Sequence, residues 1–253
     1  MPKIVCVHSF RDGVGKTTVT ANLAALLVGR GLRVCVVDTN FNRPELHRQF
    51  GKTDSDFSHA LSDFLAGDCP ADKIVYEITP ALGKSKGRVY LIPAHSNSKR
   101  EKQITREGFD PTLFREGLDE IATAHHIDIF LIDGAAGIDH AALPIFAVTD
   151  LLAIVMRLGN EDFQGTGVLV EIADKMEVPH SFLVVCDVPD SYDFNNVRGE
   201  VERVYGREVG AVVPHVEIPP GLGRTGITAI DFPNSPMVLA LSEVAKRIVH
   251  WKG

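Results

Sequence analysis

Seven short runs of consecutive apolar residues recur along this chain and alternate with stretches of helical periodicity. A run that is apolar at every position indicates a strand covered on both faces. The runs lie at residues 3–8, 33–38, 88–93, 128–133, 151–156, 182–186 and 208–213. Between them, apolar side chains fall on one helical face, as at Val19, Leu23, Leu26 and Leu27, at Leu113, Phe114, Leu118 and Ile121, and at Val197, Val201 and Val204. The alternation predicts an α/β fold with a doubly wound, mainly parallel sheet and helices on both faces.

Composition narrows the class of protein. The chain has 253 residues, 45% of them hydrophobic, and a net charge of −7, which predicts one soluble globular domain spanning residues 1–253 and argues against strong DNA binding. Its four cysteines form no C-x-x-C pair, and no apolar run approaches the length of a membrane span. We therefore expect reduced cysteines and a cytoplasmic location.

Residues 40–87 interrupt the regular alternation. This stretch is rich in Asn, Asp, His, Pro and Gly and contains one segment with a helical pattern, residues 56–67. The sequence GKSKGR at residues 83–88 is typical of an exposed turn. Neither stretch has the composition of a linker between domains.

The first apolar run leads into FRDGVGKT at residues 10–17, which we call the P-loop because it nearly matches the phosphate-binding pattern G-x-x-x-x-G-K-[ST]. Gly13 and Gly15 allow the backbone to approach phosphate oxygens, Lys16 brings a cation to the β and γ phosphates, and the Thr17 hydroxyl can bind Mg²⁺. The helix that follows offers its N-terminal amides to the same anion. The pattern departs at position 10, where Phe10 replaces glycine.

Two aspartates end apolar runs, at Asp38 and Asp133. A buried carboxylate is costly unless it meets a cation, water or a hydrogen-bond donor. Water-mediated binding of Mg²⁺ accounts for both residues, and the alternative is that each caps the turn that follows it. Gly134 and Gly137 would then give flexibility to a loop that senses the γ-phosphate.

The stretch RDGVGKTTVTANLA resembles the variant phosphate loop K-G-G-V-G-K-T-T of the MinD/ParA family, in which position 10 need not be glycine. VCVVDTN resembles the second strand of that family and its switch I carboxylates, and IDIFLIDGAAGID resembles its Walker B strand and switch II. SPMVLALSEVAKRIVHW resembles its closing helix. The resemblance implies a SIMIBI-class P-loop NTPase fold, with ATP and Mg²⁺ as cofactors.

The resemblance also implies roles for individual residues. Arg11 occupies the position of the extra basic residue that reaches across a dimer to the nucleotide of the partner. The catalytic residues would be Arg11, Lys16, Asp38 and Asn40, and the metal site would involve Thr17, Asp38 and Asp133. The nucleotide would contact Asp12, Gly13, Val14, Gly15, Lys16, Thr17, Thr18, Asp187 and Pro214.

Three positions differ from the family pattern. Asp12 replaces a glycine and places a carboxylate beside the phosphates, unless its side chain turns outward or meets Arg11. Asn40 replaces the aspartate that orients water and lacks its negative charge. Cys186 and Asp187 stand where relatives often have an asparagine-containing pair that reads the base. Asp187 could accept a hydrogen bond from the adenine amino group or be a solvated loop residue, and both readings stay open.

The sequence therefore predicts an Mg²⁺-dependent ATPase that forms a homodimer with ATP and switches an unidentified partner protein. One alternative is a nucleotide-binding module that does not hydrolyse ATP, or does so very slowly. Another is a bacterial tyrosine kinase of the same fold, since VVDTNFNRPELHRQF resembles those enzymes, but the tyrosines are only Tyr76, Tyr90, Tyr192 and Tyr205. We expect no membrane anchor, because the apolar stripe of residues 236–250 is accounted for as a core-facing helix.

Overall fold

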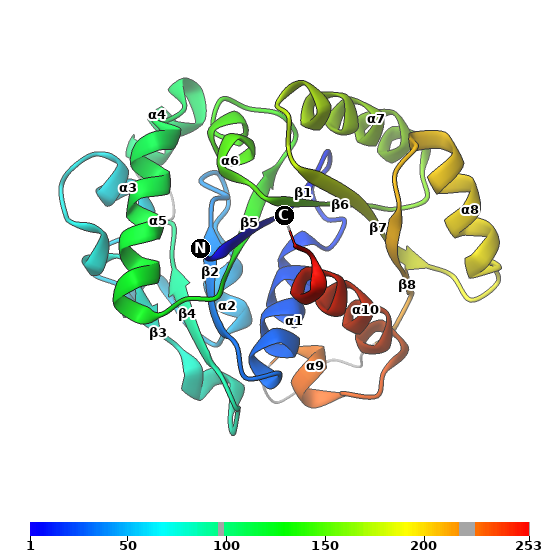
Figure 1. The fold of residues 1–253 in the computed structure, drawn as a ribbon, viewed down its shortest axis with the longest axis horizontal. Helices are drawn as coiled ribbons and strands as arrows, with labels where there is room; N and C mark the ends of the chain where they lie inside the picture. The colour runs from blue at the N-terminus through cyan, green and yellow to red at the C-terminus, as the bar shows by residue number, and fades with distance from the viewer. Residues whose placement is uncertain (96–98, 218–225, 253) are drawn as a thin grey trace.

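The computed structural model describes residues 1–95, 99–217 and 226–252. One eight-stranded sheet crosses the molecule in the order β3-β4-β2-β5-β1-β6-β7-β8 (Figure 1). Its strands are β1 (Lys3–Ser9), β2 (Arg33–Asp38), β3 (Tyr76–Glu77), β4 (Arg88–Ile92), β5 (Ile129–Ala136), β6 (Leu151–Met156), β7 (His180–Val188) and β8 (Val209–Pro214). All neighbouring strands pair in parallel except β3 and β4, which are antiparallel. The doubly wound, mainly parallel α/β fold is confirmed.

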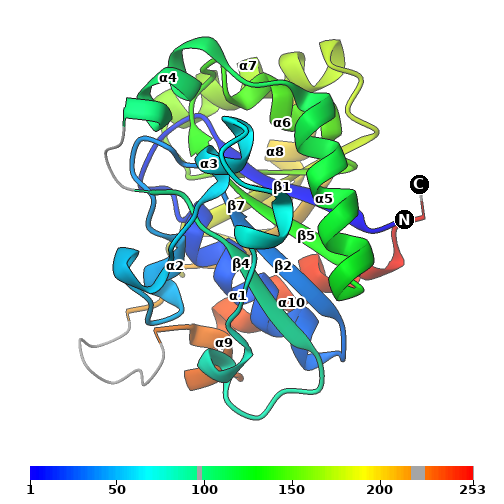
Figure 2. The same ribbon diagram turned by 90° about the vertical axis from the view of Figure 1, so that its left-hand side faces the viewer.

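Helices cover both faces of the sheet. They are α1 (Lys16–Gly29), α2 (Leu46–Gln49), α3 (Leu61–Leu65), α4 (Lys99–Glu107), α5 (Pro111–His125), α6 (Ala142–Val148), α7 (Asn160–Lys175), α8 (Phe194–Tyr205), α9 (Thr228–Asp231) and α10 (Pro236–His250). Short 3₁₀ helices are η1 (Asp54–Asp56), η2 (Ala71–Lys73) and η3 (Thr79–Leu82). Helices α1 and α10 lie on one face, and α5, α6, α7 and α8 contribute to the core on the other (Figures 1 and 2).

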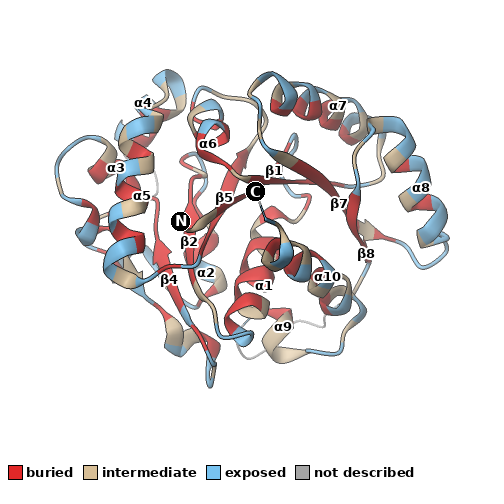
Figure 3. Cartoon of the chain, in the orientation of Figure 1, coloured by how far each residue is buried: buried red, intermediate tan, exposed pale blue. Residues whose placement is uncertain are grey.

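The strands are buried on both sides, as their uninterrupted apolar sequences require. In β1, Ile4 and Cys6 belong to the core cluster beneath α5 and α6, whereas Val5 and Val7 belong to the cluster beneath α1 and α10. Figure 3 shows the consequence: the central strands are buried almost throughout, and the helices expose only their outer faces. This arrangement leaves the carboxyl ends of the parallel strands as the place where loops and polar side chains gather.

The seven apolar runs all became strands, and the helix at residues 236–250 buries its predicted stripe, Val238, Leu241, Val244, Ala245 and Ile248. Strand β3 was not foreseen, because two residues carry no periodicity and their pairing with β4 is a tertiary contact. The segment 56–67 is helical only over Leu61–Leu65. Val204, on the predicted face of α8, is 52% exposed at the last turn.

The cysteines are all unpaired: Cys6, Cys35 and Cys186 are buried, and Cys69 is partly buried. Among residues 1–95, 99–217 and 226–252, no helix is both long and apolar enough to span a bilayer.

Candidate nucleotide-binding site

The P-loop joins β1 to α1 and has the backbone shape of an anion cradle. Gly13 has φ 75° and Gly15 has φ 107°, values at which a side chain would strain the backbone. Gly15 is the N-cap of α1, and no side chain among the described residues caps it there. The first turn of α1 also lacks acidic residues. The N–H groups at the start of α1 are therefore available to an anion.

Lys16 is folded back onto the P-loop and is only 6% exposed. Its Nζ donates to Ser9 Oγ at 3.0 Å and lies 3.7 Å from Asp12 Oδ1. Burial lowers the pKa of the Lys16 ammonium, and the carboxylates of Asp133 and Asp12 oppose that shift. The buried Lys16 ammonium, with the exposed Asp12 carboxylate beside it, would be stabilised further by a second anion.

The sequence allowed the Asp12 side chain either to pair with Arg11 or to turn outward, and it does not pair with Arg11. Its side chain is turned outward, 78% exposed, and its carboxylate contacts Lys16 instead. Arg11 lies 3.1 Å from Glu161 and 3.6 Å from Asp162, both in the first turn of α7. The two predicted site residues therefore point to different parts of the molecule.

Phe10, which broke the standard pattern, packs against the same helix. A Cβ atom on Gly165 of α7 would lie 2.0 Å from the Phe10 ring, so only glycine permits this contact. Position 10 thus carries a side chain that joins the P-loop to α7, alongside the ion pairs of Arg11.

Asp133 lies directly beneath the start of α1 and is 1% exposed. Its two carboxylate oxygens accept hydrogen bonds from Thr17 Oγ1 at 2.7 Å and Thr20 Oγ1 at 3.2 Å. Burial raises the pKa of Asp133 to about 6, although the Thr17 hydrogen bond and the Lys16 charge oppose the shift. Thr20 was missed from the sequence, although its spacing of three residues from Thr17 places both hydroxyls on one face of the helix.

Asp38 pairs with Asp133 in the register of β2 and β5 and is fully buried. It accepts backbone N–H bonds from Asn40 at 3.0 Å and Leu46 at 3.1 Å, so it also organises the turn that leads into α2. Burial and the neighbouring Asp133 carboxylate raise its pKa well above the usual range. Two buried carboxyl groups that disfavour each other's charge are a site that a cation would stabilise.

Asn40 is committed to a local turn. Its Oδ1 accepts from the backbone N–H of Arg43 at 3.2 Å, and Arg43 pairs with Glu45 at 2.9 Å. The side chain therefore has a fixed orientation close to Asp38, at the carboxyl end of β2.

Asp187 lies at the end of β7 with φ 62°, an uncommon backbone conformation for a non-glycine residue. Its carboxylate is 2.5 Å from His215 Nδ1 and 3.1 Å from Arg157 Nη1. The hydrogen bond and charge of Asp187 raise the pKa of His215. Pro214, the last residue of β8, is buried and directly precedes His215 in the sequence. Asp187 therefore lies within β7, 32% exposed and ion-paired, and is not a solvated residue of a loop.

The remaining predicted contacts, Val14 and Thr18, flank the loop. Val14 is 3% exposed and its side chain belongs to the core, and the Thr18 carbonyl accepts from Asn22 Nδ2 at 2.8 Å. Val14 can therefore offer a nucleotide its backbone and not its side chain.

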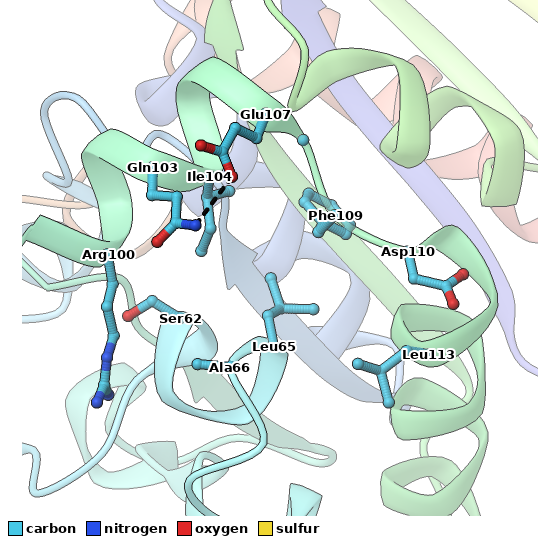
Figure 4. Close-up of a pocket in the computed structure, with 11 residues that line it drawn as sticks. Ser62, Leu65, Ala66, Arg100, Gln103, Ile104, Glu107, Phe109, Asp110 and Leu113 are labelled. Atoms are coloured by element: carbon cyan, nitrogen blue, oxygen red, sulfur yellow. Dashed lines mark hydrogen bonds between the residues drawn. The ribbon is translucent and has the colours of Figure 1, made fainter.

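A separate hollow of about 360 Å³ lies between α3, α4 and α5 (Figure 4). Leu65, Ile104 and Leu113 line its apolar part, and Gln103 and Glu107 are joined at its rim by a hydrogen bond of 2.8 Å. Arg100, also at the rim, is engaged by the carboxylates of Asp63 and Asp68. None of the P-loop residues lines it.

A glycine loop that presents a lysine and a threonine at a helix start, above carboxylates on two adjacent parallel strands, defines the P-loop nucleotide-binding proteins. Residues 2–180 match the model of a family described as an AAA domain. The chain belongs to this family and is a P-loop ATPase of the MinD/ParA type, a group of ATPases involved in spatial positioning.

Several relatives match almost the whole chain. An uncharacterized ATP-binding protein of Methanocaldococcus jannaschii is 25% identical over 97% of this chain and 87% of its own length. The antiactivator FleN of Pseudomonas aeruginosa is 21% identical over 98% and 87%. A shorter match is to EpsB of Ralstonia nicotianae, provisionally named a tyrosine-protein kinase, with 44% identity over 28% of this chain and 9% of that protein.

Solved structures agree on the fold. MinD of Pyrococcus horikoshii, solved with Mg-ADP, superposes with a TM-score of 0.76 at 21% identity, covering 99% of this chain and 97% of that one. The MinC:MinD complex of Aquifex aeolicus gives the same TM-score of 0.76 at 18% identity, with 99% and 97% coverage.

Proposed function

We propose that this chain is an Mg²⁺-dependent ATPase that dimerises around ATP and acts as a switch on a partner protein. The observation that carries the proposal is the arrangement at the start of α1, where Thr17 donates to Asp133 and the buried Lys16 stands beside an uncapped helix N-terminus. The Mg-ADP complex of the P. horikoshii protein and the MinC:MinD complex support the cofactor and the existence of a partner.

Three side chains near the start of α1 would hold the metal. The Thr17 hydroxyl and the carboxylates of Asp38 and Asp133 are oxygen donors, which Mg²⁺ prefers. Both carboxyl groups have raised pKa values because burial disfavours their charge, so a cation there would stabilise the ionised forms. The residues therefore fit the ion. When bound, Mg²⁺ would neutralise charge on the phosphate oxygens.

The chain's own residues would then act as follows. Backbone N–H groups at the start of α1 bind the phosphates, and Lys16 exchanges its hydrogen bond with Ser9 for phosphate oxygens. Thr17 and Asp133 hold the cation site in place through their 2.7 Å hydrogen bond. Asp38 and Asn40 orient the attacking water at the end of β2. At the base, Asp187 and Pro214 contact the adenine.

Arg11 would act across the dimer. In the single chain its guanidinium is held by Glu161 and Asp162 of α7. Dimerisation would transfer Arg11 to the phosphates of the partner's nucleotide, for which its planar donor fork is well suited. The same transfer would release the acidic turn of α7, giving the partner protein a surface that differs between the two states.

Intrinsic hydrolysis would be slow. Asn40 can hold a water molecule but cannot accept its proton, and general bases typically contribute about 10² to 10⁴ in rate. The ATP-bound dimer would then persist until a partner stimulates turnover. A module that binds nucleotide without hydrolysing it is the alternative that measured turnover would identify, and phosphotyrosine formation would identify a kinase.

The decisive experiment is the molecular mass of the protein in solution with ATP, with ADP and without nucleotide. We expect a dimer with ATP only. A mass that is independent of nucleotide would contradict the switch, and absence of nucleotide binding in calorimetry would contradict the assignment of the P-loop.

We also propose that residues 1–253 form a single ATPase domain that works in the cytoplasm. The continuity of the sheet from β3 to β8 supports the first point. The four unpaired cysteines support the second, because free thiols are typical of reducing compartments. We expect no strong DNA binding.

A further inference from the structure

His8 is fully buried at the end of β1, two residues before the P-loop begins. Its Nε2 lies 2.7 Å from the carbonyl oxygen of Gly137, in the segment that follows Asp133. Burial lowers the pKa of His8 to about 4, so the ring is neutral and carries one N–H. Because Gly137 offers a carbonyl, that hydrogen is on Nε2, and Nδ1 carries a lone pair.

Nδ1 has no hydrogen-bond partner among the described residues. It faces Gly134, where a Cβ atom would lie only 2.4 Å away. A buried acceptor without a donor is unfavourable, and most buried polar atoms avoid it. The ring therefore occupies a position that packing alone does not explain, between the two glycines of the 134–137 segment.

The strand pairing is irregular at the same point. Val7 pairs with Asp133 and Ser9 pairs with Ala136, so two residues of β5 lie opposite His8. Such bulges redirect the chain next to functional sites. Gly137 has φ 78°, and its N–H donates to the Ser9 carbonyl at 3.0 Å. One peptide residue is thus held to β1 through both its N–H and its carbonyl.

The segment has no bulky side chain that would hold it in place. Its sequence is Gly-Ala-Ala-Gly, so no side chain in it is larger than a methyl group. It begins directly after Asp133, which contacts Thr17 at the cation site. The hydrogen bond from His8 is therefore a side-chain restraint at the point where the segment leaves β5, next to the backbone hydrogen bond that Gly137 donates to Ser9.

We propose that His8 is a positioning residue that holds the 134–137 segment in its resting position and sets how strongly a γ-phosphate must attract that segment to move it. The inference rests on the proposed function, because it takes a nucleoside triphosphate as the ligand. A ligand shifts such an equilibrium only by its differential affinity for the two positions. A stronger hydrogen bond between His8 and Gly137 therefore weakens the binding of a nucleoside triphosphate. It leaves the binding of a diphosphate unchanged, because a diphosphate has no γ-phosphate to attract the segment.

The test compares variants that differ in one donor. His8→Met removes the N–H and keeps an apolar side chain of similar length, whereas His8→Gln retains an amide donor that can reach Gly137. Phe146→Leu is the control for packing, because the Phe146 ring contacts His8 edge-on at 4.9 Å and makes no hydrogen bond to it. Affinities for ATPγS and ADP are measured by calorimetry, and amide exchange of residues 134–138 by mass spectrometry.

We expect His8→Met to bind ATPγS about tenfold more tightly than wild type, the effect of losing one buried hydrogen bond, with ADP affinity unchanged within twofold. Exchange in the segment should accelerate by a similar factor without nucleotide. His8→Gln should resemble wild type in both measurements, and Phe146→Leu should lower only the melting temperature.

Equal changes in ATPγS and ADP affinity, or unchanged exchange of the segment in His8→Met, would overturn the proposal. A readout that needs no variant is the His8 Nε2–H signal in ¹⁵N-histidine spectra, which should change with ATPγS and persist with ADP. If wild type binds no nucleotide, the proposed function fails, whereas exchange in the nucleotide-free variants still decides whether His8 restrains the segment.

Discussion

The contact between Arg11 and α7 should limit dimerisation by an amount that can be worked from its geometry. Arg11 is 46% exposed, Glu161 is 76% exposed and Asp162 is 7% exposed. Exposed ion pairs contribute about 0–1 kcal/mol, and the burial of Asp162 places this pair toward the upper end, at roughly 0.5–1 kcal/mol. Since both protomers must release Arg11, the total is about 1–2 kcal/mol per dimer, or roughly a five- to thirtyfold change in Kd.

The perturbation is the double variant Glu161→Gln and Asp162→Asn, which removes both charges at nearly constant volume. Its dimer Kd, measured by sedimentation equilibrium in ATPγS, should fall by that factor. A small loss of stability is also expected, because both carboxylates lie in the first turn of α7 and favour its dipole. Glu171→Gln is the matched control: it lies on the same helix but pairs with Lys175 at 2.7 Å.

A double variant whose Kd lies within twofold of wild type would refute the competition between α7 and the partner's nucleotide for Arg11. So would normal dimerisation of Arg11→Ala, since the residue would then have no role across the interface. Tighter dimerisation of Glu171→Gln would show instead that general charge on α7 opposes association.

Four further outcomes are expected. Lys16→Ala should abolish ATP binding in calorimetry while leaving the fold intact, because it removes the cation that faces the phosphates. Asn40→Asp should raise steady-state ATP turnover about tenfold or more, if water is oriented at this position; unchanged turnover would mean that Asp38 or Glu45 holds it. Burial lowers the pKa of His8 from 6.5 to about 4 in the folded chain, so the unfolded chain binds the His8 proton at a higher pH. The free energy of unfolding should therefore fall as the pH drops from 6.5 to about 4. Urea unfolding measures this, and the fall should be smaller in His8→Gln. Neither anionic liposomes nor duplex DNA should retain the protein at physiological salt, and ATP-dependent, salt-sensitive retention would contradict this.

The sheet was predictable because its strands are buried on both faces. Continuous apolar runs such as residues 151–156 leave no polar face for solvent, and alternation with helices then requires parallel pairing. Strand β3 was not predictable, because Tyr76 and Glu77 become a strand only by lying against β4. The local sequence pattern predicts elements that bury a whole face. A short edge strand such as β3 forms only because another strand lies beside it, and the local sequence does not show that neighbour.

The candidate site was predictable where the chemistry is local. The spacing of Gly13, Gly15 and Lys16 indicates a phosphate loop whatever surrounds it. The neighbours of Arg11 were not predictable, because Glu161 and Asp162 are 150 residues away in sequence and meet it only through the β1–β6 pairing. His8 was missed for a similar reason, since a histidine in an apolar strand gives no sign of the carbonyl it will meet.

The buried charged groups at the start of α1 lower the stability of the folded chain when no ligand is bound. Burial opposes ionisation of Asp38, Asp133 and Lys16 at once. The attraction between Lys16 and Asp133 offsets this in part, whereas the Asp133 charge adds to the penalty at Asp38. A cation beside the two aspartates and an anion beside the lysine would relieve both penalties together, because each ligand charge meets a buried charge of opposite sign. Nucleotide and metal should therefore bind cooperatively, each more tightly in the presence of the other. Such coupling would distinguish a metal-bound triphosphate from a free phosphate ester, since only the former brings a cation to the aspartates together with an anion to Lys16.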